Sequence, residues 1–183
     1  MRINLNLDPD HYVAPKNLIQ GNLNPMNFKV GIVCAKFNSL ITKSLLMGAI
    51  QGLSEHGMTE NQMATYFVPG AFEVPLLVDQ IFPTVDAVIA IACVIKGDTP
   101  HFDYVCQGIT SGLTTAIHTH QKPGIFCVLT TNTIEQAQER AQPNSVNNKG
   151  YEAAIGALEM LNISSSIRPL SADLSNNLTE LDS

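Results

Sequence analysis

The chain lacks the features that mark nucleic-acid-binding, membrane-spanning and secreted proteins. Its 183 residues include only 10 Lys and Arg against 16 Asp and Glu, which gives a formal net charge of −6. No basic block is present that would attract nucleic acid or an anionic membrane. No apolar run reaches the roughly 18 residues that a membrane span needs, and residues 1–6 lack a signal-peptide core. We therefore expect a cytoplasmic protein that binds neither nucleic acid nor membranes.

Cysteine is scarce, and no two cysteines have the spacing of a metal site or a redox motif. Cys34, Cys93, Cys106 and Cys127 lie mostly inside apolar runs, which is typical of buried free thiols in a reducing compartment. Neither a CxxC nor an HExxH motif occurs, so we expect no metal. Cys93 has no adjacent base in the sequence and is not predicted to be a nucleophile.

What the chain does contain is a 45% hydrophobic sequence in which short apolar runs alternate with helical patterns. Continuous runs of this kind are typical of buried parallel strands, and the alternation predicts helices on both faces of one sheet. The fold class is therefore α/β, a three-layer α/β/α sandwich whose ligands bind beyond the carboxyl ends of the strands. The predicted strands are residues 28–35, 64–68, 87–93 and 124–129, and the predicted helices include 133–140 and 149–161.

One domain is expected at residues 17–163. Residues 1–16 are predicted to be a loose extension, and the polar residues 164–183 a mobile tail. Residues 17–23 form a strand-capable arm, separated from the first core strand, that could pair with its own sheet or with a neighbour's exposed edge.

The stretch from Val94 to Val105 is predicted to pass from a strand through a turn into a helix. Gly97 permits an unusual turn, and Pro100 suits the first helical turn. Free amides at a helix start favour anions, and histidine, here His101, is the side chain that titrates near neutrality. The sequence predicts an anion site beside a proton carrier. A capped turn with a solvated histidine is the alternative, because such turns are common.

Four further side chains have a functional and a structural interpretation each. Phe37 could stack on a flat heterocycle, although packing within its own domain is the commoner role. Glu73 could bind ligand hydroxyls or simply be an acid favoured at a helix start. Arg140 and Lys149 could bind a phosphate or be solvated charges at helix ends.

Taken together, several blocks resemble the lumazine synthase family. They are residues 35–38 (Ala-Lys-Phe-Asn), 68–75 (Val-Pro-Gly-Ala-Phe-Glu-Val-Pro), 94–105, 129–137, and 148–150 with the helix to Met160. The arm at residues 19–23 is similar to the family's arm. The blocks occur in the family's order over residues 18–161.

The resemblance implies a flavodoxin-like fold, namely a four-stranded parallel sheet with an N-terminal arm strand. It implies that a ribitylaminouracil condenses with dihydroxybutanone phosphate to dimethyl-ribityllumazine, the penultimate step of riboflavin synthesis, without metal or organic cofactor. By position, His101 would move protons. The remaining implied site residues are Phe37, Ala71, Phe72, Glu73, Cys93, Val94 and Ile95 for the pyrimidine and its ribityl chain; Asp98, Thr99 and Arg140 for the phosphate; and Phe126 and Lys149 from a second subunit.

The resemblance also implies a homo-oligomer, since members form pentamers or shells of sixty subunits; the sequence leaves pentamer, decamer and shell open. Two departures stand out: Lys96 replaces a common arginine, and residues 141–148 replace a glycine- and lysine-containing loop. A non-catalytic binder of flavin-like or phosphorylated ligands, or a shell scaffold, is the alternative function.

Overall fold

The computed structural model describes residues 16–145 and 147–179, and its centre is a four-stranded parallel sheet in the order β2-β1-β3-β4. The strands are β1 (Val30–Ala35), β2 (Met63–Val68), β3 (Ala87–Ile95) and β4 (Gly124–Thr131). Every residue of β1 is buried, as are the first seven of β3, because helices cover both faces of the sheet. The predicted α/β class and parallel sheet are confirmed.

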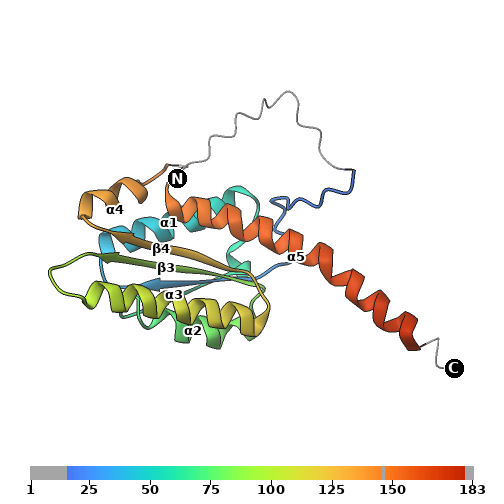
Figure 1. Cartoon of the computed structure of the whole chain (residues 1–183). Coiled ribbons are helices and arrows are strands. Elements are labelled where there is room, and N and C mark those ends of the chain that lie inside the picture. The colour runs from blue at the N-terminus through green and yellow to red at the C-terminus, as the bar shows by residue number, and fades with distance from the viewer. Residues whose placement is uncertain (1–15, 146, 180–183) are drawn as a thin grey trace.

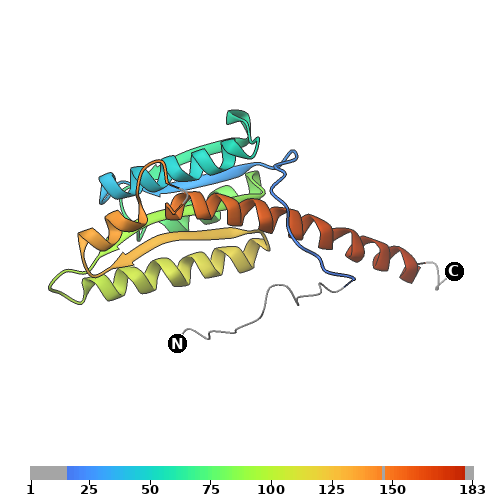
Figure 2. The ribbon, with the colours of Figure 1, turned by 90° about the horizontal axis from the view of Figure 1, so that it is seen from above.

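Two helical layers enclose the sheet (Figure 1). Helices α1 (Ser39–Glu55) and α5 (Lys149–Thr179) pack against each other and cover one face, as Figure 2 shows from above. Helices α2 (Val74–Ile81) and α3 (His101–His120) cover the other. The short α4 (Ile134–Arg140) follows β4, and the 3-10 turns η2 (Glu60–Gln62) and η3 (Phe82–Thr84) precede β2 and β3. Each layer has its own apolar cluster.

Several helix ends lie at or near the residues that mark them in the sequence. Gly57, with φ 92°, follows the end of α1, and the Thr133 hydroxyl accepts the amide of Gln136 at the start of α4. Pro100 directly precedes α3. Gly97 differs from the prediction, because it has no positive φ and a Cβ there would meet only open space. Its turn therefore does not require glycine.

Strands β3 and β4 are longer than predicted at the end where the ligand was expected. Val94 and Ile95 continue β3 and pair with Thr130 and Thr131 of β4. The Lys96 amide then bonds the Thr131 carbonyl over 2.9 Å. The loops at this edge consequently begin from a rigid, hydrogen-bonded base.

Residues 18–25 form no strand with the chain's own sheet, so that one of the two expected pairings of the arm is not seen, and pairing with a neighbour's exposed edge stays a prediction. The arm instead lies on α5, where Gly21 passes so close that a Cβ would overlap the backbone of Glu159. The side-chain amide of Asn162 donates to the carbonyls of Asn22 and Asn24 over 3.0 and 2.9 Å. A buried asparagine thus fixes the point where the arm crosses the helix.

The prediction that α5 ends at Leu161 was wrong, because the helix continues to Thr179 and extends past the sheet (Figure 1). A helix satisfies its backbone hydrogen bonds within the segment, so it can continue beyond the last residue that packs against the core. Of the predicted N-terminal extension, residues 1–15 lie outside the described part of the chain. No helix in the described ranges is long and apolar enough to cross a membrane.

Candidate active site

A cleft of about 690 Å³ opens at the carboxyl ends of β1, β2 and β3. The loops that follow these three strands all contribute to its walls, as expected for a parallel sheet with helices on both faces. The cleft has a largely apolar floor with a few polar groups at its edge, which is the usual composition of a small-molecule site. Among its lining residues are Phe37, Asn38, Ala71, Phe72, Glu73, Cys93, Val94, Ile95, Thr99 and His101.

Phe37 is held on the cleft by its backbone and by the residue that follows it. Its ring is 71% exposed, while its amide bonds the Pro69 carbonyl over 3.1 Å. Asn38 adopts a left-handed conformation (φ 55°, ψ 46°), which asparagine tolerates better than most residues. Its side-chain amide donates to the Cys93 carbonyl over 2.9 Å. The aromatic ring is therefore exposed on a backbone tied to two neighbouring strands.

Glu73 is the N-cap residue of α2 and lies at the edge of the same cleft. One carboxylate oxygen accepts the Gly70 amide over 2.9 Å, which closes the loop after β2 on itself. A carboxylate at a helix start is electrostatically favoured. The loop thus presents the charged Glu73 carboxylate as a hydrogen-bond acceptor, and the bond to the Gly70 amide holds the loop in this shape.

His101 is the first residue of α3 and is exposed on the cleft. Amides in the first turn of a helix have no carbonyl partner within the helix, and their dipoles favour an anion. Thr99, two residues earlier, also lines the cleft. The start of α3 and the His101 imidazole are therefore adjacent on the cleft, and anion binding there stays a prediction.

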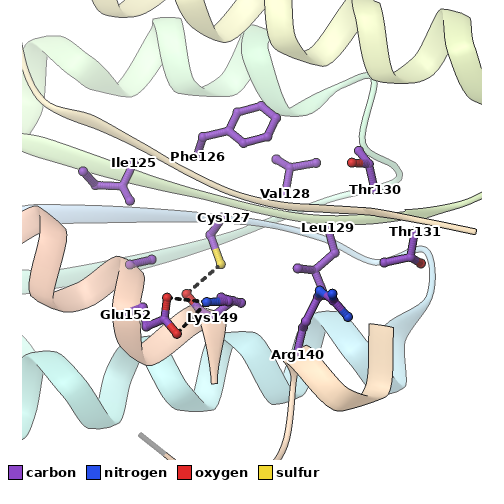
Figure 3. Close-up of a pocket in the computed structure, with 11 residues that line it drawn as sticks. Ile125, Phe126, Cys127, Val128, Leu129, Thr130, Thr131, Arg140, Lys149 and Glu152 are labelled. Atoms are coloured by element: carbon purple, nitrogen blue, oxygen red, sulfur yellow. Dashed lines mark hydrogen bonds and ion pairs between the residues drawn. The ribbon is translucent and has the colours of Figure 1, made fainter. Parts of the chain in front are cut away.

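A second pocket of about 410 Å³ lies along β4, between that strand, Arg140 and the start of α5 (Figure 3). Because alternate strand residues face opposite sides, Phe126 points away from Cys127 and Lys149, as Figure 3 shows. The Phe126 ring is 46% exposed. Strand β4 is an edge strand of the sheet, so the second pocket lies beside an edge that has no strand partner within the described chain.

Two cations line this second pocket, and each has an acidic partner on its own element. The Lys149 ammonium donates to both carboxylate oxygens of Glu152 over 2.6 Å. The Arg140 guanidinium donates to the Gln136 carbonyl over 2.8 Å and lies 3.6 Å from the Glu139 carboxylate. Both cations are exposed, so these pairs are weak by themselves and can exchange for a ligand anion.

Comparison with known proteins identifies the chain's relatives. A family model described as 6,7-dimethyl-8-ribityllumazine synthase matches residues 27–165. A curated protein of that name from Lactiplantibacillus plantarum is 46% identical over 156 residues, which are 84% of this chain and 96% of the relative. The chain belongs to the lumazine synthase family. The matched region includes every residue that lines either pocket, but neither the arm at residues 17–23 nor α5 beyond residue 165.

In this member of the lumazine synthase family, all but one of the predicted site residues line one of the two pockets, and no residue lines both. Asp98 lines neither pocket, although its neighbours Gly97 and Thr99 both line the first cleft. A carboxylate repels an anion, so a contribution from Asp98 to phosphate binding would have to come from its backbone. The first cleft contains Phe37, Ala71, Phe72, Glu73, Cys93, Val94, Ile95, Thr99 and His101, and the second pocket contains Phe126, Arg140 and Lys149.

The pocket-lining residues that were not predicted as site residues include Asn38 and Glu152. Asn38 follows Phe37 directly, and an asparagine before a helix start signals a left-handed turn. Glu152 lies three residues after Lys149, the spacing at which helix side chains meet. Both signals were present in the sequence, but neither says that a pocket lies beside it.

Each pocket is lined by one buried cysteine, Cys93 in the first cleft and Cys127 in the second pocket. Burial raises the pKa of Cys93 to about 11 and that of Cys127 to about 12, so both thiols stay protonated at neutral pH and are poor nucleophiles. Within residues 16–145 and 147–179, no three His, Cys, Asp or Glu side chains come together as a metal site would require.

Proposed function

We propose that this chain condenses 5-amino-6-(D-ribitylamino)uracil with 3,4-dihydroxy-2-butanone 4-phosphate to 6,7-dimethyl-8-ribityllumazine, releasing phosphate and water. The observation that carries the proposal is the first cleft, which brings Phe37, Glu73 and His101 together beside a helix start. This combination suits a flat polar heterocycle and an anion. The family membership makes the reaction specific.

Each group in the cleft has a role that follows from its chemistry. The exposed ring of Phe37 stacks on the pyrimidine. The end of β3, at Cys93, Val94 and Ile95, offers backbone hydrogen-bonding groups to the edge of the pyrimidine ring. Glu73 accepts hydrogen bonds from the ribityl hydroxyls. Ala71 and Phe72 complete the wall beside them.

His101 moves protons during the condensation. Imine formation requires a proton to be delivered to and removed from the same centre, which suits an imidazole near neutral pH. Phosphate departs, so fixed donors at the turn of Asp98 and Thr99 stabilise charge as it leaves. Holding two substrates in contact can supply roughly 7–11 kcal/mol of the barrier reduction, so much of the acceleration does not depend on His101.

The second pocket completes the site of a neighbouring subunit. Phe126, Arg140 and Lys149 line a pocket separate from that of His101, and a head-to-tail ring brings the two surfaces together at every joint. We propose a homo-oligomer, a pentamer or an assembly of pentamers, that acts in the cytoplasm without a cofactor. Guanidinium and ammonium groups from the neighbour then bind the phosphate.

The test is to supply the purified full-length protein with both substrates and to follow lumazine fluorescence together with released phosphate. Equal rates of both signals above a protein-free control support the proposal. Tight binding of the pyrimidine without turnover would instead support the non-catalytic binder that the sequence left open. Solution mass measured on the same sample gives the number of subunits.

A further inference from the structure

Asn148 is buried, 1% exposed, and all the hydrogen bonds of its side chain go to the backbone of two other segments or to the start of α5. Its amide nitrogen donates to the carbonyls of Ser44 and Gln142 over 3.2 and 3.0 Å. Its oxygen accepts the Gly150 amide over 2.8 Å. One side chain therefore joins α1, the loop after α4 and the start of α5.

Ser44, on α1, closes the other end of the same loop. Its hydroxyl donates to the carbonyl of Ala141, the residue directly after Arg140. Its own carbonyl accepts from Asn148, the residue directly before Lys149. Both ends of the 141–148 loop are thus hydrogen-bonded to Ser44 on α1. One of these bonds is made by the residue next to Arg140, and the other by the residue next to Lys149.

Glycines make room for this arrangement. A Cβ on Gly48 of α1 would collide with the side-chain oxygen of Asn148, and one on Gly150 would overlap the Leu45 carbonyl. Further out, an open groove of about 440 Å³ separates α1 from Pro143 and Asn144. At Pro143 and Asn144 the groove separates the loop from α1, whereas the hydrogen bonds of Ser44 and Asn148 attach it to α1 at its two ends.

We propose that Asn148 and Ser44 are positioning residues that set the spacing between Arg140 and Lys149 for the phosphorylated substrate. The proposal rests on the proposed function. Arg140 and Lys149 are long, exposed side chains, so their precision depends on where their backbones are fixed. Neither Asn148 nor Ser44 lines the pocket that contains the cations, and both act through the loop.

The experiment measures kcat and the KM of each substrate for full-length wild type, Ser44→Ala and Asn148→Ala. We expect Ser44→Ala to raise the KM of the phosphorylated substrate roughly 3- to 10-fold, the equivalent of one hydrogen bond, and Asn148→Ala to raise it further. The KM of the pyrimidine stays within about twofold of wild type, because its predicted contacts lie in the other cleft.

Asn162→Ala is the matched control. Asn162 is also a buried asparagine of α5 whose amide bonds two carbonyls of a remote segment, but that segment is the arm and not the loop. It should lower the melting temperature about as much as Asn148→Ala while leaving the ratio of the two KM values unchanged.

Three outcomes decide the matter. If both variants lower the melting temperature yet leave the KM ratio at the wild-type value, the pair is merely structural and the proposal is overturned. If Asn148→Ala fails to fold, Ser44→Ala alone decides, because it removes a single hydroxyl from a half-buried position. Absence of turnover in wild type overturns the proposed function itself, together with the positioning roles built on it.

Discussion

At the scale of single residues, His101 combines an exposed position with the first turn of a helix. Replacing it with alanine removes a proton carrier but leaves the backbone amides beside it in place. We expect turnover to fall roughly 100-fold, at the lower end of what general acid–base groups contribute, with a flatter pH dependence near neutrality. Pyrimidine binding should stay nearly intact.

Turnover by His101→Ala should be compared with wild type between about pH 6 and 8, the range that brackets a free histidine. Asp103→Ala serves as a control, because Asp103 is exposed in the first turn of α3 but does not line the cleft. Wild-type turnover across that range would remove His101 from the mechanism.

Cys127 gives a prediction about stability in alkali. Burial raises its pKa from 9.0 to about 12 in the folded chain, so above pH 9 the unfolded state binds fewer protons than the folded state. The stability contributed by this thiol is complete below pH 9 and is lost as pH rises toward 12, by up to about 1.4 kcal/mol per pH unit.

Urea unfolding on both sides of pH 9 should therefore show a steeper decline for wild type than for Cys127→Ala. The slope with pH is the readout, because the cavity left by alanine lowers stability at every pH. Cys106→Ala, at a half-buried thiol, should change the slope less. Parallel declines of wild type and Cys127→Ala would refute the assignment.

At the scale of elements, the contact between α1 and α5 depends on glycines that allow the two backbones to approach. A Cβ at Gly150 would overlap the Leu45 carbonyl, and one at Gly52 would come within 2.8 Å of the Ala154 Cβ. Backbone atoms cannot swing aside as a flexible side chain can. The start of α5, and with it Lys149, is therefore placed by the surface of α1.

Gly150→Ala should lower the free energy of unfolding by about 1–3 kcal/mol, the usual cost of overpacking. Gly156→Ala is the same change on the same helix, where a Cβ meets nothing within 4 Å. It should raise stability by about 0.5–1 kcal/mol, because alanine suits a helix interior better than glycine. Chemical unfolding of both variants checks the opposite signs.

The elements that the sequence predicted well are those whose signals are local. Continuous apolar runs marked β1 and β3, and Thr133 marked the start of α4. The extra length of β3 and β4 was not predictable, because it comes from pairing between strands. The course of the arm was missed because it depends on Asn162, far along the chain.

The same distinction applies to the candidate site. Phe37, Glu73 and His101 lie in, or at the end of, the segments that connect β1, β2 and β3 to the helices after them, so the parallel topology brings them to one cleft. The bond from Asn148 to Ser44 joins residues 104 positions apart, and no spacing rule reveals it. That α5 continues to Thr179 was missed because a polar sequence shows no apolar stripe, although a helix needs none for its own hydrogen bonds.

At the scale of the whole molecule, one chain holds two pockets that share no lining residue. In the proposed ring, His101 of one subunit and Arg140 of the next form one site. Mixing a His101→Ala protein with an Arg140→Ala protein should raise activity above that of either variant alone, because some joints then pair two unaltered surfaces.

Complementation requires conditions under which subunits exchange, and exchange is verified with differently labelled samples. The control mixes Arg140→Ala with a protein that carries both substitutions; no joint in that mixture has an unaltered Arg140, so activity should not rise above that of Arg140→Ala alone. If labelled subunits mix and the first pair regains nothing, both residues act within one chain.

The separation of the two pockets has a further consequence for the assembly itself. A ligand that contacts both chains at a joint binds the assembled ring more tightly than the separate chains, so it stabilises each interface between subunits. At a concentration 100 times its Kd, such a ligand adds about 2.7 kcal/mol against dissociation. In the proposed ring, we therefore expect dissociation on dilution to be slower when substrate is present than when it is absent.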